Sequence, residues 1–144
     1  MNKPLPDKWI RKAFFEACNG MAVDGLTIPV YDYRVTGDDA PANYVLMTTQ
    51  SNQVNKLSQC GYVWESDLLV EVFTTYSPTG DTGSRLLSDN ILNEVRERVQ
   101  DLQLDPASSM KVDIRTFQFP NDLSTITQTK IVFRKFIRIL LTID

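Results

Sequence analysis

The chain has 144 residues, a formal net charge of −3 from 15 basic and 18 acidic side chains, and no histidine. This length predicts a single domain, residues 1–144, that can bury a core without disulfides or metal. The mild acidic balance argues against a protein that holds nucleic acid by neutralising phosphates, and the absence of histidine removes the commonest general base and the commonest metal ligand.

The cysteine count and the hydropathy pattern limit the compartment and the partners. Cys18 and Cys60 are too few for a disulfide framework or a zinc site, so we expect two buried, reduced thiols in a protein made in the cytoplasm. The sequence contains no run of 18 apolar residues, so it predicts no membrane span. The N-terminus has no apolar segment of the signal-peptide kind. We therefore expect no membrane partner, no metal and no cofactor.

The first part of the chain predicts a helix followed by two strands. Apolar side chains at helical spacing indicate a helix over residues 7–19. Residues 26–34 read as a short strand, which Pro29 restricts to an edge of the sheet because proline has no N–H to donate. Residues 44–49 form the next predicted strand, and the polar stretch 50–61 predicts a long connection.

The rest of the chain predicts a strand, a helix and a closing pair of strands. Residues 63–76 alternate in polarity over their length, and an apolar stripe over residues 84–102 indicates an amphipathic helix. Residues 111–119 alternate again, and Pro120-Asn121-Asp122 predicts a turn into the terminal strand. This order of elements predicts an α+β fold, with a mostly antiparallel sheet and two helices packed on one of its faces.

The terminal stretch, residues 125–144, is the segment against which we expect the rest to pack. Alternate positions from Ile131 to Ile143 are apolar apart from Lys135, and β-branched residues dominate. This pattern favours a strand over the helix that several of the same apolar residues also permit. Such a strand would extend about 45 Å, so we expect part of it to project beyond the core and meet a neighbour.

Several short motifs resemble catalytic or metal-binding signatures but lack the setting that the chemistry needs. Ser108–Lys111 fits S-x-x-K without a helix to align the lysine, and Ser88–Asn90 fits S-D-N inside a predicted helix. Gly80–Gly83 contains D-T-G without the flanking apolar strands of an aspartic protease. Asp38 and Asp39 have no third ligand at the spacing of a calcium loop. We predict no catalytic, cofactor-binding or metal-binding residue and no enzymatic activity.

Three basic side chains of the terminal strand, Arg134, Lys135 and Arg138, have two interpretations. They are either solvated charges that protect a sheet edge or partners of acidic groups on an adjacent copy of the chain. The second interpretation defines a candidate oligomer interface. Its six residues are Asp38, Asp39, Asp122, Arg134, Lys135 and Arg138.

A family resemblance is carried by two short segments and by the order of the elements. The segments are Pro29-Val30-Tyr31-Asp32 and Tyr44-Val45-Leu46, joined by a loop rich in Gly, Asp, Ala and Pro. In these segments, and in the order of its elements over nearly the whole chain, the sequence resembles the tail terminator, or tail completion, proteins of tailed bacteriophages. These proteins are small components of the connection between head and tail.

The resemblance implies a structural virion protein without catalysis. Members of the family form rings, usually hexameric, that complete the tail and join it to the connector of the head, while DNA passes through the lumen without sequence-specific binding. The implied partners are further copies of the chain, the connector or adaptor protein and the tail-tube protein. The implied location is the neck of the virion, after synthesis in the host cytoplasm.

We expect the ring contacts to come from the terminal strand or from loops 36–43 and 50–61. Two alternatives stay open at this point. One is a neck or adaptor ring of a short-tailed virion, and the other is a small α+β protein-binding module that acts by strand addition.

Overall fold

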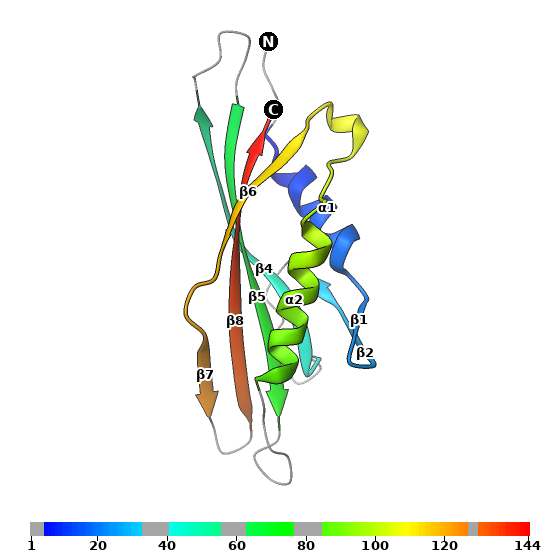
Figure 1. Cartoon of the computed structure of the whole chain (residues 1–144), viewed down its shortest axis with the longest axis vertical. Helices are drawn as coiled ribbons and strands as arrows, with labels where there is room; N and C mark the ends of the chain where they lie inside the picture. Colours follow the sequence, from blue (N-terminus) through cyan, green and yellow to red (C-terminus); the bar gives the residue numbers. More distant parts are fainter. Residues whose placement is uncertain (1–4, 33–40, 56–62, 77–84, 127–129) are drawn as a thin grey trace.

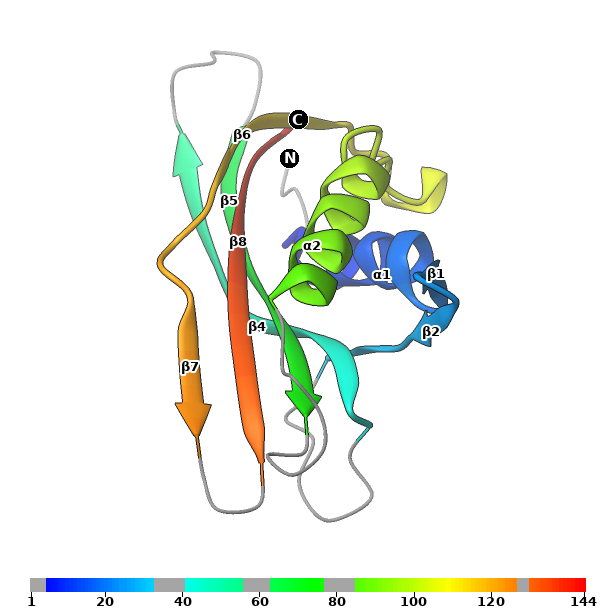
Figure 2. The same cartoon turned by 60° about the horizontal axis from the view of Figure 1, so that its bottom comes forward.

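In the computed structural model, which describes residues 5–32, 41–55, 63–76, 85–126 and 130–144, two helices cover one face of a long twisted sheet (Figures 1 and 2). The helices are α1 (Asp7–Cys18) and α2 (Leu86–Val99), with a 3₁₀ helix at Pro106–Ser108. The strands are β1 (Met21–Val23), β2 (Leu26–Ile28), β3 (Val30–Tyr31), β4 (Asn43–Asn55), β5 (Val63–Tyr76), β6 (Val112–Gln118), β7 (Leu123–Ile126) and β8 (Ile131–Ile143). The predicted α+β fold is confirmed.

The terminal strand β8 lies in the middle of the sheet. The strand order is β3-β4-β5-β8-β6, and β7 also pairs with β8. β8 runs antiparallel to β5 along its whole length, while its other side is shared by β6 and β7. The β3–β4 pair is parallel, and β1 and β2 form a separate hairpin. A strand with neighbours on both sides cannot be an edge, so the prediction that its basic residues protect an edge is wrong.

The core forms between the helices and the half of the sheet that carries the C-terminal end of β8. Ile137, Ile139, Leu141 and Ile143 of β8 are buried in it. They alternate because successive side chains of a strand point to opposite faces. The helices contribute two apolar stripes at helical spacing. These are Ile10, Ala13, Phe14 and Cys18 of α1 and Ile91, Val95 and Val99 of α2.

The sheet continues past the helix layer, as Figure 2 shows at the end that carries β7. Residues 131–136 of β8 are only half-buried, and every residue of β7 is exposed. The length of the terminal strand predicted that part of it would project beyond the core, and the structure agrees. Contact of this part with a neighbouring molecule stays a prediction.

The first part of the sheet differs from the prediction at Pro29. The expected strand 26–34 is divided, because β2 ends at Ile28 and β3 begins at Val30 in a different sheet. β2 pairs with β1, a strand that the prediction missed. Asp24 and Gly25 join them with φ of 50° and 78°, the left-handed turn for which Asp-Gly is a typical sequence signal.

The predicted connection 50–61 is wrong in its first half, because β4 continues to Asn55. Residues 49–55 pair with β5 across a bulge between Met47 and Thr49. The alternation of apolar side chains that marks a half-buried strand is absent here, but polar partners replace it. Asn52 accepts a hydrogen bond from the Ser66 hydroxyl at 2.5 Å, and its amide donates to the Asp7 carboxylate at the start of α1.

The predicted turn at Pro120-Asn121-Asp122 is also wrong. β6 and β7 run in the same direction and follow one another along the same side of β8, so residues 119–122 form a break in an edge and not a reversal. Proline fits such a break because it cannot donate to a strand partner.

Removing a buried side chain of β8 tests its place in the core. Ile139 is 1% exposed, and Ile139→Ala is expected to lower the free energy of unfolding by about 2–5 kcal/mol through lost burial and a residual cavity. The matched control is Ile126→Ala, since Ile126 is 76% exposed, and it should cost less than about 0.5 kcal/mol in dilute solution. Urea unfolding of the full chain measures both. Equal costs for the two variants would contradict a buried, central β8.

Candidate functional site

The face of the sheet opposite the helices, which we call the helix-free face, carries a group of charged and aromatic side chains. No described helix or strand packs over it (Figure 2). It is formed by the side chains that alternate with the buried core residues of β5 and β8 and by their register partners on β4. Arg115 of β6 joins them through its ion pair with Glu65. The members discussed below are Tyr44, Glu65, Asp67, Glu71, Phe73, Arg115, Arg134, Phe136 and Arg138.

Ion pairs cross this face from strand to strand, and we call the three of them the ion-pair ladder. Arg138 Nη1 lies 2.9 Å from Asp67 Oδ2, Arg134 Nε binds Glu71 Oε1, and Arg115 Nη1 lies 3.6 Å from Glu65 Oε1. The first two pairs share one geometry. Each arginine of β8 lies opposite an apolar residue of β5 and reaches diagonally to the carboxylate two positions earlier in β5.

Glu71 is the most buried member of the ladder, with 2% of its surface exposed. Its carboxylate binds Arg134 and also lies 3.4 Å from the Thr48 hydroxyl. The Arg134 guanidinium is 5.4 Å from the ring centre of Phe73 and 5.7 Å from that of Phe136. A buried carboxylate is costly without a cation, so Glu71 needs the Arg134 guanidinium beside it. The two aromatic rings help to hold that guanidinium in place.

The aromatic side chains extend this cluster toward the β3 edge. The Tyr44 ring stacks on Phe73 with centroids 4.7 Å apart and meets Tyr31 edge-on at 5.8 Å. Tyr44 is buried, although it belongs to the face that the helices do not cover. The helix-free face therefore has a small packed cluster of its own, separate from the main core.

The predicted interface residues separate into two groups on opposite faces of β8. Arg134 and Arg138 lie on the helix-free face, as described above. Lys135 lies on the helix side, where its Nζ binds Asp89 of α2 and is 3.7 Å from Asp122 Oδ2. Asp38 and Asp39 lie outside the described residues.

Each of the three predicted basic residues therefore has an acidic partner within its own chain. Prediction from sequence missed Asp67, Glu71 and Asp89 as these partners. The alternation in residues 63–76 places Asp67 and Glu71 on one face, but only the pairing register shows which basic residue each meets. Pairing with acidic groups of an adjacent copy stays a prediction.

The motifs that resemble catalytic signatures occupy ordinary structural positions. The Ser88 hydroxyl donates to the Arg85 carbonyl at the start of α2, and the Ser108 hydroxyl donates to the Asp105 carbonyl at 2.7 Å. Burial raises the pKa of the Cys18 thiol to about 12, so this thiol is protonated at neutral pH. Gly80–Gly83 lies outside the described residues. Within the described ranges, no three residues of the metal-ligating types come together.

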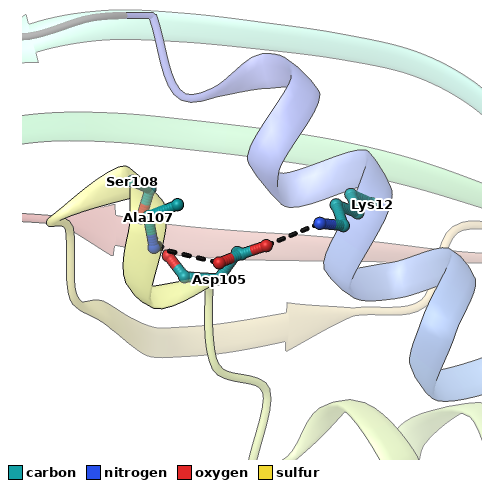
Figure 3. Close-up of polar contacts among 4 residues, drawn as sticks. All are labelled: Lys12, Asp105, Ala107 and Ser108. Atoms are coloured by element: carbon teal, nitrogen blue, oxygen red, sulfur yellow. Dashed lines mark hydrogen bonds and ion pairs between the residues drawn. The ribbon is translucent and has the colours of Figure 1, made fainter.

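Lys12 and Asp105 join α1 to the segment that follows α2 (Figure 3). Lys12 Nζ donates to Asp105 Oδ2 at 2.5 Å, and Asp105 Oδ1 accepts from the Ala107 backbone N–H at 2.9 Å, which caps the 3₁₀ helix. The hydrogen bond from Lys12 lowers the pKa of Asp105 and raises the pKa of Lys12. The pair fixes how the first helix lies against the connection from α2 to β6.

One solved structure with a similar chain is described as the virion of a native gene transfer agent (GTA) particle. The match has a TM-score of 0.60 and 15% sequence identity, and it covers 94% of this chain and 96% of that chain. At this identity the likeness shows a shared fold. No protein-family model matches the sequence, and no curated protein matches it. Neither of the two described helices has the length and apolar character of a membrane span.

Breaking the Glu71–Arg134 pair tests its role on the helix-free face. Arg134→Met is expected to lower the free energy of unfolding by about 2 kcal/mol, because it leaves Glu71 buried without its cation. The double variant Glu71→Met/Arg134→Met should cost less than Arg134→Met alone, since no buried charge remains. Arg138→Met is the control, because that more exposed pair should contribute less than about 1 kcal/mol. A cost for Arg134→Met no larger than that of Arg138→Met would contradict the assignment.

Asp105→Asn tests the Lys12–Asp105 pair through its pH dependence. Since the pKa of Asp105 is lowered by folding, its contribution is complete above the ordinary value of 3.8 and is lost as the pH falls through the folded value. Since the pKa of Lys12 is raised, its contribution is complete below 10.5 and is lost as the pH rises through its folded value. We expect Asp105→Asn to lower Tm at pH values between 3.8 and 10.5. Below the folded pKa of Asp105 and above the folded pKa of Lys12, the Tm of the variant should match that of the native chain.

Asp101→Asn provides the control for this experiment, because Asp101 is an exposed carboxylate of the same connection. It removes the same charge without touching Lys12. Thermal unfolding followed by circular dichroism at a series of pH values gives the comparison. If the two variants have the same pH profile, the pair does not stabilise the fold.

Proposed function

We propose that this protein is a structural component of a tailed-phage-like virion, that it forms a ring at the junction of head and tail, and that the ring completes the tail and connects it to the head. The observation that carries the proposal is the fold match to a chain of a gene transfer agent virion over 94% of this chain and 96% of the other. With nearly all of both chains included, the likeness concerns the whole described fold and not a common substructure. The tail-terminator resemblance of the sequence points to the same class of protein.

The shape of the molecule supports assembly with copies of itself. The sheet is longer than its helix cover, and apolar side chains are exposed where it projects. These are Leu123 and Ile126 of β7. Exposed apolar groups clustered at one end of a sheet are typical of a surface that another protein covers. A ring of like subunits provides such a cover for every copy.

The helix-free face suits the wall of a passage for DNA. In the proposed ring the helices lie outside, and the ion-pair ladder faces the lumen. Its three arginines are each bound to a carboxylate, so they offer few uncompensated charges to passing phosphates. The net charge of −3 acts in the same direction. DNA then passes without sequence-specific binding and without strong retention.

In this role the partners are other copies of the chain, the connector or adaptor protein on the head side and the tail-tube protein on the tail side. A hexamer is the stoichiometry that the family resemblance implies. The alternative, a neck or adaptor ring of a short-tailed virion, differs from this proposal in its neighbours. Co-purification with tail-tube protein or with portal protein distinguishes the two positions.

The oligomeric state of the purified full chain tests the proposal. We expect size-exclusion chromatography with light scattering to give a species near six times the 16.4 kDa of one chain, and negative-stain images to show rings with a central hole. A strictly monomeric species at every concentration, with no ring in the images, would contradict the proposed function.

A further inference from the structure

β7 is an exposed edge strand without the usual protection against pairing. It pairs with β8 on one side, and no described strand lies on its other side. All four of its residues are exposed, with Leu123 at 48% and Ile126 at 76%, and none is charged. A free edge with a row of backbone N–H and C=O groups and exposed apolar side chains is a template for another strand.

Two other free edges of the sheet are protected. β6 carries Asp113 and Arg115, and charged residues on an edge strand oppose pairing. β3 has two residues and follows Pro29, which has no N–H. The N–H of Val30 is already used, because it donates to Asn19 Oδ1 at 3.0 Å. The protection of β6 and β3 makes the lack of it at β7 informative.

The outer half of β4 provides a second edge without a described strand partner, and its Gln50 and Asn52 bind Asp7 of α1 on the helix side. β3 pairs only with Val45 and Leu46 of β4, so residues 48–55 have β5 on one side and no described strand on the other. These eight residues, Thr-Thr-Gln-Ser-Asn-Gln-Val-Asn, include no charged side chain. β7 and this half of β4 lie at opposite edges of the sheet, so each can provide the strand partner that the other does not have. Neither carries a charged side chain that pairing would bury.

We infer that β7 of one copy adds to the outer half of β4 in the next copy, so that the sheets of neighbouring subunits join into one continuous wall. This inference rests on the ring of the proposed function and assigns the surface that closes it. The contact uses two different edges, so it is heterologous, and repeated rotation closes it into a ring.

The strand directions agree with such a join. β8 is antiparallel to both β7 and β5, and β5 is antiparallel to β4, so β7 and β4 run in opposite directions. In a ring with rotational symmetry the junction is therefore antiparallel, the more stable kind of pairing.

The two edges also lie at opposite ends of the strands. β7 pairs with residues 131–134 of β8, whereas β4 beyond its bulge pairs with the part of β5 that faces residues 138–143. Neighbouring copies are then displaced along the strand direction, as the tilted strands of a closed barrel require. A continuous sheet keeps all helix-free faces on one side of the wall, with the ion-pair ladder of each copy repeated around the lumen.

Charges placed on β7 test the junction. Leu123→Lys/Ile126→Lys adds two charges to the proposed contact, and Thr116→Lys/Gln118→Lys adds the same two charges to the exposed residues of β6 as a matched control. Light scattering of the full chain over a concentration series gives the concentration of half-assembly. We expect the β7 variant to raise it roughly tenfold or more and the β6 control to leave it near that of the native chain.

Hydrogen exchange of the native chain tests the same junction without any substitution, so the outcome does not depend on a variant folding. Amides of both Leu123–Ile126 and residues 49–55 should exchange more slowly in the assembled protein than in the dilute one. If the native chain forms rings while both segments stay unprotected and the β7 variant assembles normally, the inference is overturned and the proposed function stands. A dimer in which only β7 is protected would indicate β7–β7 pairing and would overturn the β4 assignment. A native chain that never assembles overturns both.

Discussion

The pairing of β8 with strands on both sides is the constraint on which the rest of the structure depends. β8 is the last element of the chain, yet it lies between β5 and the β6–β7 edge. Its alternate residues are buried in the core beneath α2 at one end and are left half-buried at the other. The same alternation places Arg134 and Arg138 on the face that the helices leave uncovered. The core, the ion-pair ladder and the projecting end therefore all follow from the register in which this one strand pairs.

The charges of this protein are arranged in pairs across strands and between layers. On the helix-free face the arginines of β8 and β6 meet carboxylates of β5, and on the other face Lys135 meets Asp89 of α2. Such pairs contribute little to stability when they are exposed, but they remove isolated positive charge from the surface. A wall built in this way suits a passage for a polyanion, because it neither binds phosphates strongly nor buries unpaired charges.

The sequence predicted the elements that have strong periodicity and failed where backbone pairing replaces it. The alternation of residues 63–76 and the stripe of α2 gave the sheet, its helix cover and the α+β class correctly. The outer half of β4 was missed because its strand is held by hydrogen bonds to β5 and by polar partners. The sequence indicated Arg134, Lys135 and Arg138 as interface residues, which stays a prediction. Their partners within the chain depend on register, which single-strand patterns do not determine. In the same way, whether β8 is an edge strand or a central strand depends on the strand order, which the pattern of one strand does not determine.

We propose that this molecule works by joining copies of itself edge to edge around a passage. Electron cryomicroscopy of the assembled full chain tests this claim most directly. We expect a ring in which the sheet runs without a break from β7 of one copy to β4 of the next, with helices outside and the helix-free faces lining the hole. A ring whose copies meet through their helices, with the β7 and β4 edges apart, would contradict it.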